Sequence, residues 1–218
     1  AMKTSAIWLL VTFLLASAMA GGAPFEGRVL FRRVEPPAVP HDIIYSVKGD
    51  NVRVEVVRDR VNSYITNTAK QETTVIMEDD MAYLTMPSLA PYPGAPKLEK
   101  TGETTKILGY PVEKYVLDSD EGRAELWLAE GLGRYTGFGE GFEQPPPQVA
   151  NVDLPEPAEP WTWEWALAGQ PLFPLRVTVA YGNGREFFRL EAIAITPQPL
   201  SDGLFVPSPN YKKLETWP

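Results

Sequence analysis

The chain has 218 residues and a formal net charge of −8, with 20 lysines and arginines against 28 aspartates and glutamates, no cysteine and one histidine. That length suits a single domain with a substantial core. The acidity argues against a nucleic-acid partner, and the absence of cysteine excludes disulfides, thiol catalysis and cysteine-bound metals.

Residues 1–20 have the three parts of a signal peptide. Lys3 supplies the positive start, residues 7–15 form an apolar run, and Ala18-Met19-Ala20 is a small-x-small cleavage site. The run is shorter than the roughly twenty residues needed to span a bilayer. We therefore expect cleavage, a mature chain without a membrane span, and a periplasmic or secreted protein; an uncleaved anchor is the alternative.

A first strand is predicted over residues 24–34, where apolar and polar side chains alternate. Residues 42–57 then predict a β-hairpin with a two-residue type II′ turn at Gly49-Asp50. This register puts three apolar pairs on one face: Val47–Val52, Tyr45–Val54 and Ile43–Val56.

Further strands follow at the spacing typical of all-β domains. Polar turns separate the strands of a predicted meander, at residues 63–67, 71–77 and 81–86. Two more strands are predicted at residues 110–117 and 123–129, with Tyr115 against Leu126 and Trp127 on the opposite face beside Lys114.

The segment from about residue 137 to residue 170 is rich in proline and aromatic residues and breaks this pattern. Residues 159–168 favour a short helix that ends at Gly169, although tryptophans spaced by two also suit a strand.

Residues 175–196 predict a closing hairpin with a type I′ turn at Asn183-Gly184, which sets Val179 opposite Phe188 and Val177 opposite Leu190. Residues 200–211 form a loop whose Leu204, Phe205 and Tyr211 hold it to the domain. The prediction is a signal peptide at 1–20 and one β-rich domain at 21–218 with an insertion at about 137–170. Its fold is mainly β, a curved antiparallel sheet of roughly nine to eleven strands with one or two short helices.

Catalytic chemistry is poorly represented. His41 has no nucleophile motif near it, and the acidic turns at 79–80 and 118–121 lack the regular ligand spacing of a calcium loop. We therefore predict no enzyme activity, no cofactor and no metal site.

Large aromatic residues are the best candidates for a binding site: Trp127, Tyr135, Phe138, Phe142, Trp161, Trp163 and Trp165. They could roof an apolar cavity over the curved sheet, where an apolar ligand would bind. The ordinary interpretation is that they plug one open face of the sheet as part of its own core.

Several motifs together resemble one bacterial exported family, domain of unknown function 4412. They occur in the family's order, at residues 47–55, 101–115, 125–128, 174–176 and 204–207. Many members carry a cysteine where this chain has Val112, so no redox role is implied. The family is similar in shape to the periplasmic lipoprotein carriers, and the resemblance implies a half-barrel able to accept an acyl chain.

The leading hypothesis is a non-catalytic envelope protein that binds a hydrophobic ligand such as a lipid or lipoprotein acyl chain. The alternative is an interaction module that docks on an envelope protein partner through the acidic, proline-rich residues 143–160.

Overall fold

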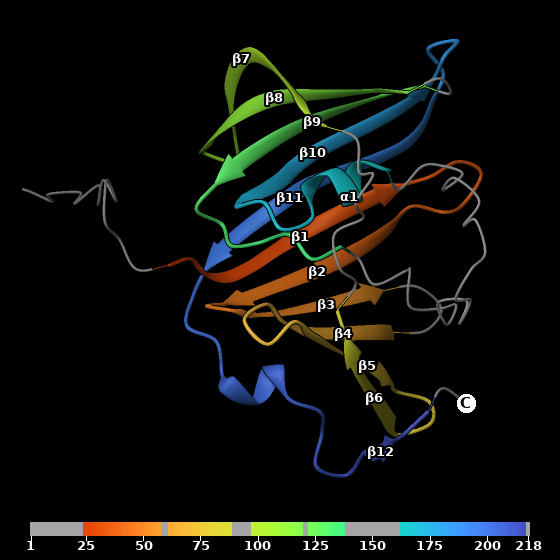
Figure 1. Ribbon diagram of the computed structural model, residues 1–218, viewed down its shortest axis with the longest axis vertical. Coiled ribbons are helices and arrows are strands. Elements are labelled where there is room, and N and C mark those ends of the chain that lie inside the picture. The colour runs from red at the N-terminus through yellow and green to blue at the C-terminus, as the bar shows by residue number, and fades with distance from the viewer. Residues whose placement is uncertain (1–23, 58–60, 89–96, 120–121, 138–161, 217–218) are drawn as a thin grey trace, which may run out of the picture.

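The computed structural model describes residues 24–57, 61–88, 97–119, 122–137 and 162–216 (Figure 1). Within these residues the strands form one unclosed, curved sheet of twelve strands, in the order β12-β6-β5-β4-β3-β2-β1-β11-β10-β9-β8-β7. The strands are β1 (Glu26–Val34), β2 (His41–Lys48), β3 (Asn51–Val57), β4 (Val61–Asn67), β5 (Glu72–Met77), β6 (Ala82–Pro87), β7 (Glu99–Ile107), β8 (Tyr110–Ser119), β9 (Gly122–Glu130), β10 (Leu172–Tyr181), β11 (Glu186–Pro197) and β12 (Lys212–Leu214). A short helix α1 (Thr162–Leu167) and a 3-10 helix η2 (Asp202–Phe205) complete the fold. The predicted mainly-β, curved-sheet class is confirmed.

The hairpin of β2 and β3 forms in the predicted register. All three apolar pairs are present, and Gly49 has the positive φ of 57° that the first central residue of a type II′ turn requires. Turn geometry and burial agree here because a slip by one residue would expose the whole apolar face.

The inner face of the sheet carries the main hydrophobic core. We use this term for the face on which Val29, Phe31, Ile43, Tyr45 and Val47 lie, each at most 1% exposed. Strand alternation puts these residues on one side of β1 and β2, and α1 packs against the same side (Figure 1).

The outer face is the opposite one, and the chain end covers part of it. Phe205 of η2 packs with Ile65 of β4 and Ile76 of β5 in a second, smaller core. Lys48 Nζ donates to the Leu200 carbonyl at 2.7 Å and fixes the start of this segment. The predicted role of residues 200–211 as a loop held to the domain by its apolar side chains is confirmed.

Two strands were absent from the prediction, so the expected count of nine to eleven strands is too low. β7 lies at the sheet edge, and eight of its nine residues are exposed, so no alternation in its sequence marks it as a strand. β12 has only three residues and pairs with β6 in parallel, which corrects the expectation of a wholly antiparallel sheet.

The turn of the last hairpin also differs from the prediction. Val179 and Val177 face Phe188 and Leu190 as expected, but a register shift between Val179 and Ala180 leaves the loop with one more residue. Tyr181 donates to the Arg185 carbonyl across Gly182-Asn183-Gly184, and Gly184 has a φ of 81°. This is the three-residue loop closed by a left-handed residue, in place of a type I′ pair.

The helix predicted at 159–168 is confirmed over Thr162–Leu167, and residues 159–161 lie outside the described residues. Trp163, Ala166 and Leu167 are all buried, and this i, i+3, i+4 pattern is the apolar stripe of a helix. Throughout the described part of the chain, every helix is too short or too polar to cross a membrane.

Candidate functional site

The candidate site lies where α1 packs on the inner face. Trp163 is the largest of the fully buried side chains, with an exposed fraction of 0%. It comes from a helix of six residues, whereas its surroundings come from the strands and from residues 131–137 after β9. A short helix therefore fills the centre of the sheet's inner face.

Aromatic rings form a continuous bed around Trp163. Tyr135 stacks on the indole at 5.6 Å between ring centroids, and Phe188 of β11 lies at 5.9 Å. Tyr45 stacks on the other side of Tyr135 at 5.9 Å, and Phe173 of β10 meets Tyr45 edge-on at 5.3 Å. Such pairs add about 0.5–1.5 kcal/mol each beyond area burial, so the rings hold α1 in place.

The indole N–H of Trp163 is buried and has no hydrogen-bond partner among the described residues. An unsatisfied buried donor costs about 1–3 kcal/mol. The ring is therefore well packed, but its polar N–H group is not satisfied by the described residues.

Polar groups border the rings on one side. The Tyr135 hydroxyl donates to Glu164 Oε1, and Tyr45 accepts from the Thr136 backbone N–H at 2.6 Å. Burial raises the pKa of Tyr45, and burial followed by the charge of Glu164 raises the pKa of Tyr135 well above its usual range. Both phenols are therefore neutral at physiological pH.

Arg33 of β1 is a charged residue on the inner face and is only 1% exposed. Its Nη2 lies 2.8 Å from Glu35 Oε2, and its guanidinium lies 5.3 Å from the centre of the Phe188 ring. A buried cation needs such partners, because desolvation without them costs several kcal/mol.

The structure brings together Tyr135 and Trp163 from the predicted aromatic set. Trp165 is half-buried on the same helix. Trp127 lies on the outer face, where Lys114 Nζ is 5.8 Å from its ring centre, so it is not part of this bed. Three further members of the predicted set lie outside the described residues: Phe138, Phe142 and Trp161.

Sequence reasoning missed the strand residues that complete the site. Tyr45 was placed on the apolar hairpin face but not connected with the aromatic set. Arg33 follows Phe31 by two residues, so alternation alone indicates that it shares the buried face. No sequence pattern indicated a role for Glu164, because its contact with the Tyr135 hydroxyl exists only in the folded chain.

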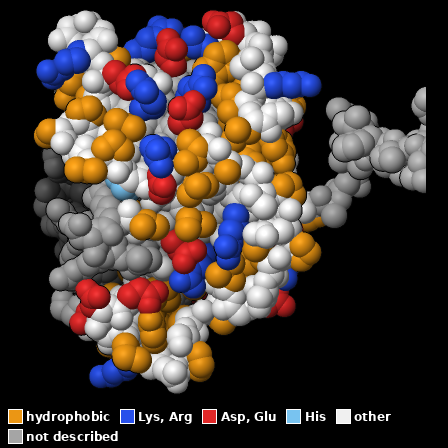
Figure 2. All heavy atoms as spheres, turned by 180° about the vertical axis from the view of Figure 1, so that it is seen from behind, with side chains coloured by type: hydrophobic (Ala, Val, Ile, Leu, Met, Phe, Trp, Pro, Cys, Tyr) orange, Lys and Arg blue, Asp and Glu red, His pale blue; other side chains and the backbone are white. Residues whose placement is uncertain are grey.

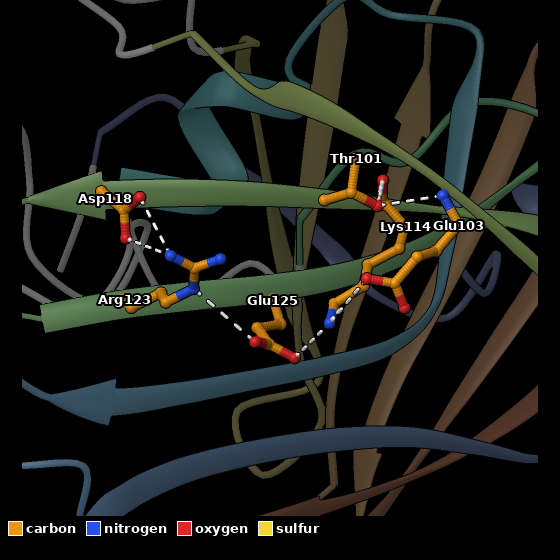
Figure 3. A network of polar contacts seen from close by, with 6 residues as sticks. All are labelled: Thr101, Glu103, Lys114, Asp118, Arg123 and Glu125. Atoms are coloured by element: carbon orange, nitrogen blue, oxygen red, sulfur yellow. Dashed lines mark hydrogen bonds and ion pairs between the residues drawn. The ribbon is translucent and has the colours of Figure 1, made fainter.

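The outer face offers no comparable site among the described residues. Figure 2 shows positive, negative and apolar side chains interspersed over it. Across β8 and β9, Lys114 pairs with Glu125 at 3.1 Å, and Arg123 pairs with Asp118 at 3.2 Å (Figure 3). Thr101 of β7 joins this network through its hydroxyl, which donates to the Lys114 carbonyl at 3.1 Å. Mixed, largely exposed pairs of this kind contribute little to stability and create no field of one sign.

The neighbourhood of His41 is an open hollow of about 540 Å³, lined by Arg32, Asp42, Val57 and residues 38–40. In the wall of this hollow, Arg32 Nε donates to Asp42 Oδ1 at 2.8 Å and Arg32 Nη2 donates to Asp42 Oδ2 at 3.1 Å, which makes a bidentate ion pair. Among the described residues there is no group of three or more His, Cys, Asp or Glu that could hold a metal ion.

The fold and site define an open, curved β-sheet protein with a helix seated on its inner face. The family model described as domain of unknown function (DUF4412) matches residues 25–211, so the chain belongs to this family. The resemblance noted from the sequence motifs is thereby confirmed.

Solved structures that match this chain over most of its length have low sequence identity to it. An uncharacterized conserved protein from Thermus thermophilus is 10% identical, with 88% of this chain and 89% of that chain covered and a TM-score of 0.49. A chain of the MucA/MucB complex of Pseudomonas aeruginosa is 11% identical, with 88% of this chain and 61% of that chain covered and a TM-score of 0.46. The LolA superfamily protein NE2245 from Nitrosomonas europaea is 12% identical, with 84% of this chain and 90% of that chain covered and a TM-score of 0.35. A search of curated proteins found no match.

Proposed function

We propose that this protein is a non-catalytic binding protein that takes up the apolar part of a lipid-like ligand on the inner face of its sheet. The ligand occupies the space that Trp163 fills in the structure described here. In this proposal α1 is a removable cover and Trp163 is the plug that the ligand displaces.

The observation that carries the proposal is the burial of Trp163 on so short a helix. Helices of fewer than about 12 residues are marginal by themselves, so α1 is held by its side-chain contacts and not by its own stability. Removal of α1 would uncover the two rings that Trp163 contacts, Tyr135 and Phe188, as part of an apolar surface over the strands. An apolar concavity of this kind is what lipid-like ligands require.

The indole N–H of Trp163, which has no hydrogen-bond partner among the described residues, supports the same proposal. A core that never opens gains nothing from an unsatisfied donor, whereas a plug released during binding regains water for that group. An acyl chain in the same place carries no polar atom that would need a partner.

The test uses diphenylhexatriene, an apolar probe that becomes fluorescent in apolar surroundings. Saturable binding to the folded protein is expected. Trp163→Ala should raise the affinity about tenfold or more, because the ligand no longer displaces packing worth about 3–5 kcal/mol.

Two further variants keep this test decisive. Trp163→Phe is a milder change that preserves an apolar ring. It should raise the affinity above that of the wild type, but less than Trp163→Ala does, and it replaces Trp163→Ala in the test if that variant does not fold. Trp127→Ala is the matched control on the outer face and should leave the affinity unchanged. The proposal is overturned if folded wild-type protein binds no probe, or if the two tryptophan positions respond alike.

Native mass spectrometry of the purified protein, followed by organic extraction, tests the proposal independently. A co-purifying lipid at near-unit stoichiometry is the expected result. The alternative function, docking on an envelope protein through residues 143–160, stays a prediction because that segment lies outside the described residues.

A further inference from the structure

The two central residues of α1 differ in chemistry in a way that suggests the kind of ligand. Trp163 places a large apolar ring in the core, and the next residue, Glu164, places a carboxylate at the polar border of that core. An apolar body joined to a carboxylate is the pattern of an amphiphile. α1 therefore presents to the inner face an internal copy of such a molecule.

The groups that face Glu164 belong to other parts of the chain and stay behind when α1 leaves. The Tyr135 hydroxyl donates its hydrogen bond to the carboxylate. Arg33 borders the same region, because its guanidinium lies 5.3 Å and the Trp163 ring centre 5.9 Å from the centre of the Phe188 ring. Arg33 Nη2 also pairs with Glu35 Oε2 at 2.8 Å.

Loss of Glu164 from this border has an electrostatic cost. A buried hydroxyl loses its acceptor, and a buried cation loses a neighbouring negative charge. An incoming carboxylate restores both interactions, a neutral head group restores at most the hydrogen bond, and a cationic head group is repelled by Arg33.

From this geometry we infer that the ligand of the inner face is an amphiphile with a carboxylate head, of the long-chain fatty-acid class. Its hydrocarbon chain replaces Trp163, and its carboxylate replaces Glu164 as the acceptor for Tyr135 near Arg33. This inference rests on the proposed function, because it assigns chemistry to the same site.

The test measures how well three ligands of equal chain length displace diphenylhexatriene at about pH 8. The ligands are hexadecanoate, hexadecanol and hexadecylamine. Hexadecanoate should compete about tenfold better than hexadecanol, which corresponds to one charge-assisted hydrogen bond, and hexadecylamine should compete worst.

Two variants with matched chemistry locate the head-group site. Tyr135→Phe keeps the ring stack and removes the hydroxyl, so it should reduce the preference for hexadecanoate over hexadecanol to about threefold or less. Tyr181→Phe removes the hydroxyl of an exposed ring at the end of β10, away from the inner-face site, so it should leave the preference unchanged.

Glu164→Gln adds an independent readout that does not require loss of function. It removes the charge that competes with the ligand and should strengthen binding of hexadecanoate more than binding of diphenylhexatriene. Equal affinities for hexadecanoate and hexadecanol, or tightest binding of hexadecylamine, would overturn the inference while the proposed function stands. Failure of diphenylhexatriene to bind would instead overturn the proposed function.

Discussion

Tyr45 and Tyr135 show at the scale of single residues how an apolar site controls ionisation. Their pKa values are raised mainly because burial disfavours a phenolate. The folded protein therefore keeps two protons that the unfolded chain releases above about pH 10. Stability that depends on these groups is complete below about pH 10 and is lost as the pH rises further.

This gives a pH prediction for stability. Between about pH 10 and pH 11 each phenol should lower the free energy of unfolding by about 1 kcal/mol, because the unfolded phenol is half ionised at about pH 10 and almost fully ionised at about pH 11. Tyr135→Phe and Tyr45→Phe should each flatten that decline, as measured by urea unfolding. Tyr181→Phe changes an exposed ring at the end of β10 and serves as the control. A decline with the same slope in all four proteins would show that these phenols do not cause it.

At the scale of elements, the hairpin of β10 and β11 shows how backbone conformation alone affects stability, without side-chain contacts. Gly182 and Gly184 lie in the same loop, and a methyl group added at either would meet nothing within 4 Å. They differ in backbone conformation, because Gly184 has a φ of 81° and Gly182 is outside the left-handed region.

These two glycines form a matched pair for mutagenesis. Gly184→Ala should lower the free energy of unfolding by about 1–2 kcal/mol, the cost of a left-handed L-residue. Gly182→Ala should change stability little or raise it slightly, because it restricts the unfolded chain. Chemical denaturation of both variants measures the difference, and equal effects would contradict the turn geometry described here.

The helix α1 shows the limit of local patterns. Tryptophans spaced by two also suited a strand, although the flanking proline and glycine favoured the helix that forms. The choice follows from burial of Trp163, Ala166 and Leu167 against the inner face, since three apolar residues at helical spacing reach that face together.

At the scale of the whole molecule, the sheet has two separate apolar surfaces with different covers. α1 covers the inner face, and η2 covers the outer face at β4 and β5. Because the covers lie on opposite sides of one sheet, their effects on binding and on stability should separate.

Phe205→Ala tests this separation. Removal of this buried ring should lower the free energy of unfolding by about 3 kcal/mol, because it leaves Ile65 and Ile76 partly uncovered. Binding of diphenylhexatriene should stay unchanged, in contrast to Trp163→Ala. Hydrogen exchange should show faster exchange in β12 and β6 with little change in β1. A gain in affinity equal to that expected for Trp163→Ala would show that the two covers act as one.

The amino-acid sequence by itself determined the parts of this fold that depend on neighbouring residues. The β2–β3 register followed from an apolar alternation joined to a glycine-first turn, and the pairing of Tyr115 with Leu126 followed in the same way. The family followed from motifs that lie in these strands and also in β7, in β10 and at η2.

Only the tertiary structure decided the features that depend on contacts between distant parts of the chain, namely the two edge strands and the aromatic site. β7 is polar on both sides and is a strand because β8 pairs with it, and β12 is too short to be recognised before β6 lies beside it. The site arises in the same manner, because Tyr45, Tyr135 and Trp163 are far apart in the chain and meet only when the sheet curves around α1. Local patterns report the face on which a residue lies, whereas long-range packing determines which faces meet.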